Sequence, residues 1–176
     1  MGPRADFPSL ATARLKLRPL RDEDAAAMAA LANDFDVARM TTAIPHPYVL
    51  AQARDFIARM QERDARREAV FAIEGEAAPF MGVIGIHPGP VGSELGYWLG
   101  RPFWRAGYAT EAARAVTAWA GTQWGRRLIV SGHFADNPAS GQVLVKVDFL
   151  YTGEVTPRRS IARGEDAPTR MMVWLA

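Results

Sequence analysis

The chain has 176 residues, of which 49% are hydrophobic and 23% are charged, and this predicts one globular domain spanning residues 1–176 and excludes a largely disordered protein. The 21 basic and 19 acidic residues give a formal net charge of +2. A sequence pI near 9.3 is compatible with nucleic-acid binding, but the arginines of residues 51–67 alternate with Asp55, Glu62 and Asp64. That segment therefore indicates a solvated face of mixed charge, and we expect no nucleic-acid partner.

Cysteine is absent, which excludes disulfides and thiolate metal ligands and fits a reducing compartment. His46, His87 and His133 are far apart and show no metal-binding spacing, so we expect no metal. The apolar runs are too short to cross a membrane, and the first eight residues have no signal-peptide core. We therefore expect a cytoplasmic protein with no membrane partner.

The first third of the chain predicts one strand and mostly helix. Alternating apolar and basic residues predict a strand over residues 13–20. Acidic residues open a helix over 22–31, and a short helix is expected over 34–40. Two prolines force a shaped loop over 44–48, and apolar residues at helical spacing then predict a third helix from Leu50 onward.

The central part predicts a meander of three strands, over 69–74, 80–87 and 93–100, separated by turns rich in glycine and proline. A helix over 109–124 follows, and its small residues suit close packing on a sheet. Because a strand that follows a crossover helix runs parallel to the strand before it, we expect a mixed sheet.

The last part predicts a strand over 127–134, a helix over 140–147 and strands over 149–156 and 169–175. The polar segment 157–168 is expected to join the last two strands. The elements together predict an α/β fold with a mixed, mostly antiparallel sheet of about six to seven strands and helices on both faces.

The turn Trp104-Arg-Ala-Gly-Tyr-Ala109 opens directly into the helix over 109–124. Gly107 can adopt a backbone conformation closed to other residues, and Ala109 permits close approach. Unpaired amides at the start of a helix, with the positive end of its dipole, suit a phosphate or pyrophosphate group. An ordinary helix start, with Gly107 making only the turn, fits the same residues.

The surrounding segments carry a more specific signal. Glu94-Leu-Gly-Tyr-Trp-Leu-Gly100 precedes the turn and Asn137-Pro-Ala-Ser140 follows it, while residues 12–20 and 44–48 extend the pattern toward the N-terminus. Together they resemble the GNAT acetyltransferases, and within them the RimJ/RimL-like branch. Trp104 stands where that family usually has Gln or Arg, which puts a side-chain role at this position in doubt but leaves the backbone amides available.

The resemblance implies a splayed central strand pair, between residues 94–100 and 127–134, that holds the pantetheine arm of acetyl-CoA. It implies that the pyrophosphate lies on the turn, that an amide near Trp98 or Leu99 meets the oxyanion, and that Asn137 contacts pantetheine. The implied cofactor-binding residues are Trp98, Leu99, Arg105, Ala106, Gly107, Tyr108, Ala109, Thr110 and Asn137.

Three residues are candidates for proton transfer. Glu94, on the strand before the turn, is the candidate general base, although a solvent-facing strand end fits it equally. The resemblance implies Ser140 as the donor to the thiolate, with Tyr151 as its rival. Asn137 and Ser140 also suit a simple helix start, in which neither touches a ligand.

The acceptor pocket is expected around Phe35, Met40, His46 and Tyr48, which could equally be helix and loop packing. The resemblance implies direct transfer to a primary amine in a ternary complex, with a protein N-terminal α-amine as the leading acceptor. A small amine such as a polyamine or an antibiotic remains an alternative, as does a non-catalytic acyl-CoA-binding module. Dimerisation is common in this branch, but no interface can be read from the sequence.

One departure lies beside the cofactor site. The family usually ends the helix over 140–147 with Leu-Gly-Phe, whereas this chain has Val147-Asp148-Phe149. Asp is a poorer left-handed helix terminator than Gly, so we expect altered local geometry there.

Overall fold

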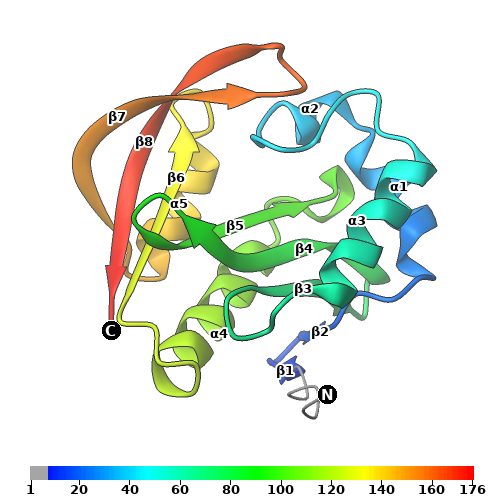
Figure 1. The fold of residues 1–176 in the computed structure, drawn as a ribbon, viewed down its shortest axis with the longest axis horizontal. Coiled ribbons are helices and arrows are strands. Elements are labelled where there is room, and N and C mark those ends of the chain that lie inside the picture. Colours follow the sequence, from blue (N-terminus) through cyan, green and yellow to red (C-terminus); the bar gives the residue numbers. More distant parts are fainter. Residues whose placement is uncertain (1–7) are drawn as a thin grey trace.

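The computed structural model describes residues 8–176, and in it eight strands form one sheet in the order β1-β2-β3-β4-β5-β6-β8-β7 (Figure 1). The strands are β1 (Leu10–Ala11), β2 (Leu15–Arg18), β3 (Ala69–Gly75), β4 (Ala78–Gly89), β5 (Gly92–Leu99), β6 (Leu128–Phe134), β7 (Leu150–Ser160) and β8 (Glu165–Leu175). Neighbouring strands are antiparallel except β5 and β6, which are parallel. The mixed sheet is confirmed, with slightly more strands than predicted.

Helices cover both faces of this sheet, as predicted (Figure 1). They are α1 (Asp24–Ala32), α2 (Phe35–Ala38), α3 (Leu50–Glu62), the 3-10 turn η1 (Arg101–Phe103), α4 (Tyr108–Thr122) and α5 (Pro138–Lys146). One core lies between the sheet and α4 with α5, and a second lies between the sheet and α1 with α3. We call these two sides the α4–α5 face and the α1–α3 face.

The small residues of α4 explain how close it lies to the sheet. Ala112, Ala113, Val116 and Ala120 are fully buried and pack in the same core as Phe71. Because these side chains are short, the helix axis can approach the strands closely, and burial of their apolar surface stabilises the contact. The helix start is thereby fixed relative to the end of β5.

The splayed pair is confirmed, and β5 and β6 pair over fewer residues than the lengths of the two predicted strands suggested. β5 and β6 pair only at Ser93 with Ile129 and at Glu94 with Val130. Farther along, the hydroxyl of Ser131 donates to the carbonyl oxygen of Leu95 at 2.9 Å. A gap therefore opens between β5 and β6 beyond Leu95. It lies at the C-terminal end of β5, which leads into η1 and α4.

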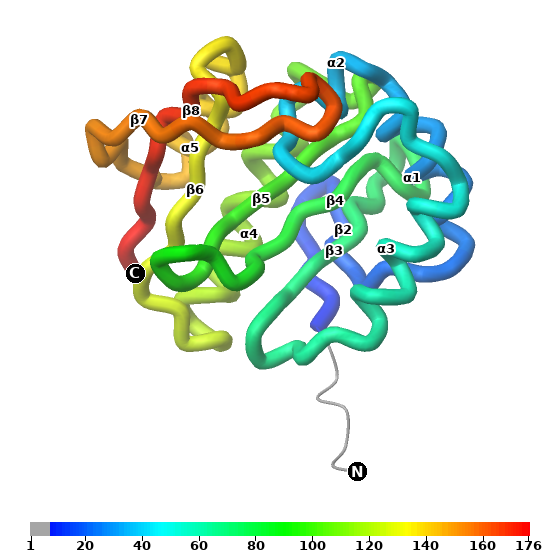
Figure 2. The backbone as a smooth tube through the Cα atoms, turned by 45° about the horizontal axis from the view of Figure 1, so that its top comes forward, coloured from blue at the N-terminus to red at the C-terminus, as the bar shows by residue number. Residues whose placement is uncertain are grey.

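The prediction for residues 157–168 was wrong, since most of this segment is strand. β7 continues to Ser160 and β8 begins at Glu165, with Pro157 opposite Pro168. Both prolines are tolerated because neither position needs a ladder N–H: β7 is an edge strand, and Pro168 lies beyond the last β6–β8 pair. In Figure 2 the hairpin tip lies beside the segment that follows α2, where the Ile161 amide donates to the Thr42 carbonyl at 3.3 Å.

In residues 8–176, no helix is long and apolar enough to cross a membrane. The N-terminal segment in which we expect no signal peptide lies largely outside the described residues.

Candidate active site

The turn before α4 has the backbone that the sequence predicts. Gly107 has φ of 82° and precedes the first residue of α4, and Arg105 also has a positive φ, of 61°. No side chain within the described part of the chain caps this helix start. The amides of Tyr108, Ala109 and Thr110 are therefore available to an anion, as predicted. We call the turn over residues 104–109 with these amides the cradle.

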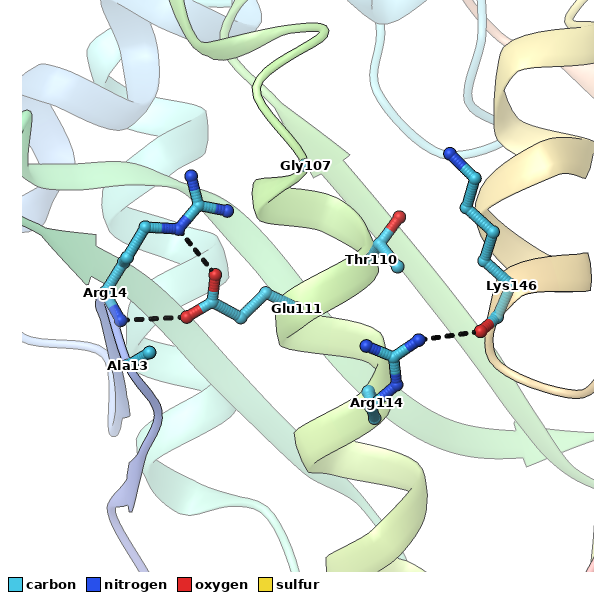
Figure 3. A pocket seen from close by; sticks show the side chains of 7 residues that line it. All are labelled: Ala13, Arg14, Gly107, Thr110, Glu111, Arg114 and Lys146. Carbon is cyan, nitrogen blue, oxygen red and sulfur yellow. Dashed lines mark hydrogen bonds and ion pairs between the residues drawn. The ribbon is translucent and has the colours of Figure 1, made fainter.

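A surface pocket of about 410 Å³ adjoins the turn and is strongly basic (Figure 3). Its lining residues are Ala13, Arg14, Gly107, Thr110, Glu111, Arg114 and Lys146. A Cβ at Gly107 would lie 3.3 Å from Nη2 of Arg14, so a larger residue would encroach on this corner as well as strain the turn. Helix amides beside three basic side chains fit the phosphates of coenzyme A.

Glu111 organises one wall of this pocket. It accepts hydrogen bonds from the Thr12 hydroxyl at 2.7 Å and from the Arg14 backbone and Nε at 2.8 and 2.7 Å, and Arg14 also donates to the Ala106 carbonyl. Burial alone would raise the pKa of Glu111, but the hydrogen bonds from Thr12 and Arg14 outweigh it and lower the pKa. The carboxylate thus holds the N-terminal segment against α4 and presents Arg14 to the turn.

The opposite wall joins α4 to α5. Nη2 of Arg114 donates to the Lys146 carbonyl at 2.9 Å, and neither side chain has an ion-pair partner within residues 8–176. Sequence reasoning missed Arg14, Arg114 and Lys146. Only Arg114 carried a usable signal, because it lies two helical turns after Gly107 and so faces the same side of α4.

Backbone direction distinguishes the two residues proposed to meet the oxyanion. The Leu95 carbonyl faces β6, and backbone groups of alternate residues in a strand point to the same side. The amides of Tyr97 and Leu99 therefore face the gap, whereas that of Trp98 faces β4. The Trp98 ring packs on the α1–α3 face beside Phe80, at a centroid distance of 6.1 Å.

Ser140 lies at the α4–α5 side of the gap and has an unforeseen partner. The Tyr97 hydroxyl is 2.8 Å from Ser140 Oγ and 3.1 Å from the Ser140 carbonyl oxygen. Burial, partly offset by the hydrogen bond with Ser140, raises the pKa of Tyr97. Asn137 precedes α5 and accepts from the Ser140 amide through Oδ1 at 3.3 Å, which leaves its Nδ2 group to contact a ligand.

Tyr151 is bound to His133 rather than to Ser140. The Tyr151 hydroxyl is 2.9 Å from His133 Nε2, and His133 Nδ1 is 2.8 Å from the Phe134 carbonyl. Because a carbonyl only accepts, Nδ1 carries a proton, and in the neutral imidazole Tyr151 therefore donates to Nε2. A Cβ at Gly141 would lie 2.6–2.7 Å from these two side chains, so they pack tightly against α5.

Glu94 lies on the opposite face of the sheet and is paired with an arginine. It is 8% exposed, and its carboxylate accepts two hydrogen bonds from Arg158 of β7, the one to Oε2 at 2.9 Å. The hydrogen bond with Glu94 raises the pKa of Arg158. His87 lies directly across from Glu94 on β4. No local pattern pointed to Arg158, because it lies 64 residues from Glu94 along the chain.

The four residues predicted for the acceptor pocket separate into three groups. Phe35 and His46 contact each other edge to face at 5.3 Å. Met40 contacts Arg163 of the hairpin turn through its sulfur at 3.5 Å. Tyr48 is buried in the core between α1 and α3, where burial raises its pKa, so the structure does not bring it to the other three.

Three carboxylates near the predicted acceptor residues, those of Asp34, Asp36 and Asp136, are each paired with arginine. Asp34 and Asp36 both bind Arg101, and their pKa values are lowered by hydrogen bonds from arginine. Asp136 binds Arg163 at 2.8 and 2.9 Å. No three His, Cys, Asp or Glu side chains in residues 8–176 are grouped to hold a metal ion.

Comparison with known proteins agrees with this geometry. The model of the acetyltransferase (GNAT) domain family matches residues 14–150. The chain belongs to the GNAT acetyltransferase family. It is therefore an acetyl-CoA-dependent acetyltransferase, and the solved structures that it resembles include acetyltransferases of the RimJ/RimL-like branch.

Three relatives illustrate the range of this GNAT group. The uncharacterized N-acetyltransferase YoaA of Bacillus subtilis is 30% identical over 154 residues, covering 84% of this chain and 85% of YoaA. RimJ of Mycobacterium smegmatis, solved with a CoA disulfide, has a TM-score of 0.83 at 21% identity, covering 97% of this chain and 88% of RimJ. Spermidine N-acetyltransferase of Vibrio cholerae, solved with CoA and spermine, has a TM-score of 0.77 at 15% identity, covering 93% and 96%.

Proposed function

We propose that this GNAT enzyme transfers the acetyl group of acetyl-CoA directly to a primary amine, and that its acceptor is a protein N-terminal α-amine. Acetyl-CoA, as the acetyl donor, supplies the reactive thioester. The turn amides from Arg105 to Thr110, with Arg114 and Lys146, would hold its phosphates, and Asn137 its pantetheine arm.

The two faces of the sheet divide the chemistry. Ser140 and Tyr97 lie on the α4–α5 face with the cradle, whereas Glu94 lies on the α1–α3 face with the acceptor residues. An amine approaching from the α1–α3 face would meet the thioester through the gap in a ternary complex. Glu94 would accept the amine proton directly or through water, and the Tyr97 or Leu99 amide would bind the oxyanion.

The observation that carries the choice of acceptor is the pairing of acidic groups with arginine. Asp34, Asp36 and Glu94, the carboxylates that a polyamine could use, are all bound to guanidinium groups. A polycation would have to compete with arginines already in place and would be repelled by them. This disfavours spermidine-like acceptors and favours an acceptor with a single amine.

The pKa of the acceptor amine also favours a protein N-terminal α-amine. At pH 7.5 about a third of an N-terminal α-amine is neutral, against about 0.1% of a lysine side chain, from their ordinary pKa values near 7.8 and 10.4. Both oxygens of Glu94 already accept hydrogen bonds from Arg158, which makes the carboxylate a weaker base. An amine that is already neutral when it binds does not need Glu94 to remove a proton before it attacks.

The test compares matched acceptors by release of free CoA with a thiol reagent, which is clean because the chain has no cysteine. One peptide has a free α-amine and no lysine, and its partner has the same sequence with an acetylated N-terminus and one added lysine. We expect turnover with the first only, and little with spermidine. Preference for spermidine or the lysine peptide would refute the acceptor, and absence of turnover with every amine would refute the enzyme.

A further inference from the structure

We propose that Tyr97 is a positioning residue that orients the Ser140 hydroxyl toward the leaving sulfur of coenzyme A. This rests on the proposed function, with Ser140 as the donor to the thiolate that the family resemblance implies. The observation behind it is the contact of the Tyr97 hydroxyl with Ser140 Oγ at 2.8 Å and with the Ser140 carbonyl at 3.1 Å.

The contact connects elements on either side of the gap. Tyr97 lies on β5 beyond the last pair with β6, and Ser140 lies in the first turn of α5, which follows β6. The two hydroxyls are half-buried on the α4–α5 face, where the Tyr97 ring packs against the core. They therefore lie on the side of the gap from which the cradle would deliver the pantetheine arm.

The number of protons decides what the pair can do. Two O–H groups share three acceptors: the Tyr97 oxygen, Ser140 Oγ and the Ser140 carbonyl. If Tyr97 donates to the carbonyl, the Ser140 hydroxyl donates its proton to the Tyr97 oxygen and cannot donate to a ligand. If Tyr97 donates to Oγ, the Ser140 proton is free to point elsewhere, and the two arrangements differ only by rotation about the C–O bonds.

In the second arrangement Ser140 donates a hydrogen bond to the sulfur as the C–S bond breaks, while the electron pair of that bond moves to sulfur. Neither hydroxyl gives up its proton permanently, because burial raises the pKa of Tyr97 and keeps the phenol neutral. The thiolate is stabilised by a fixed dipole and takes its proton from solvent, so the overall products are the N-acetylated amine and CoA thiol.

The test follows the ionisation of CoA bound to the protein, with thiolate absorbance as the signal. The chain contributes no thiol of its own, so the titrating thiol is that of CoA. Wild type, Y97F, S140A and Y97F/S140A are saturated with CoA and titrated with alkali. T117V is the matched control, because it removes a buried hydroxyl of α4 that donates only to carbonyls of its own helix.

We expect the bound thiol of the wild type and of T117V to ionise about one pH unit below the thiol of free CoA, measured in the same way. Y97F and S140A should each lose most of that lowering, and the double variant should lose no more than S140A. In turnover, Y97F should lower kcat about tenfold with KM for acetyl-CoA changed less than about twofold.

A wild-type titration curve in Y97F, or additive losses in the double variant, would overturn the proposal. So would a thiol that titrates as in free CoA on a wild-type protein that acetylates amines, and in that case the proposed function survives. If the wild type fails to bind CoA at all, the proposed function fails and the role of Tyr97 fails with it.

Discussion

Removal of Arg158 should destabilise the protein and removal of its partner should restore much of the loss. In R158M the Glu94 carboxylate, whose side chain is 11% exposed, loses both hydrogen bonds that it accepts within the described residues. Leaving one charge of a buried pair unpaired costs roughly 3–5 kcal/mol. Because the Arg158 side chain is 23% exposed and water can enter where it leaves, we expect about 3 kcal/mol, the lower end of that range.

The double variant E94L/R158M removes both charges and should be within about 1 kcal/mol of wild type, hence more stable than R158M. R158K keeps the charge without the two-pronged geometry of a guanidinium and should be intermediate. Urea unfolding measures the free energies, and for R158M we expect Tm to fall by about 6–12 °C. A loss under 1 kcal/mol in R158M, or a double variant less stable than R158M, would show that the pair does not hold Glu94 in place.

Three further predictions concern the cofactor side. D148G should raise the free energy of unfolding by about 0.5–1 kcal/mol in urea, because Asp148 has φ of 69° at the end of α5, where Gly has no Cβ penalty; a loss of stability would contradict this. The pKa of Glu111 is lowered from its ordinary 4.5, so its contribution is present above that pH and is lost as pH falls. E111Q should therefore be less stable than wild type at pH 7, and a difference that persists at pH 3 would contradict the linkage. K146M should weaken CoA binding about threefold to tenfold in calorimetry at low salt, and the difference should shrink in 0.5 M salt, because exposed charges are screened; R114M should behave alike, and a salt-independent effect would count against direct phosphate contact.

The sequence predicted well the features that depend on neighbours along the chain. The positive φ at Gly107 follows from the glycine itself and the helix pattern after it. The altered geometry expected at Asp148 is not found, because Asp148 takes the left-handed conformation, with φ of 69°, that Gly usually supplies at the end of a helix. The parallel β5–β6 pair follows from strand, crossover helix and strand in that order, whereas the splay of these strands was implied by the resemblance to the GNAT family.

Partners from distant segments could not be predicted in this way. Arg158 and Glu94 are 64 residues apart, and Arg14 and Glu111 are 97 apart, so their contact depends on sheet order and register. The error over residues 157–168 has the same origin. Prolines end an interior strand, but they are compatible with an edge strand, and which strand forms the edge is a property of the whole sheet.

The central claim is that the turn before α4 holds acetyl-CoA, and calorimetric titration of the purified protein with acetyl-CoA tests it most directly. G107E places bulk and negative charge in the cradle, and G107A is the control for backbone strain, since a Cβ there would meet only the far end of the Arg14 side chain, at 3.3 Å. We predict saturable binding by wild type, weakened binding by G107A and none by a folded G107E. Absence of binding by wild type, or equal affinity in G107E, would contradict the account.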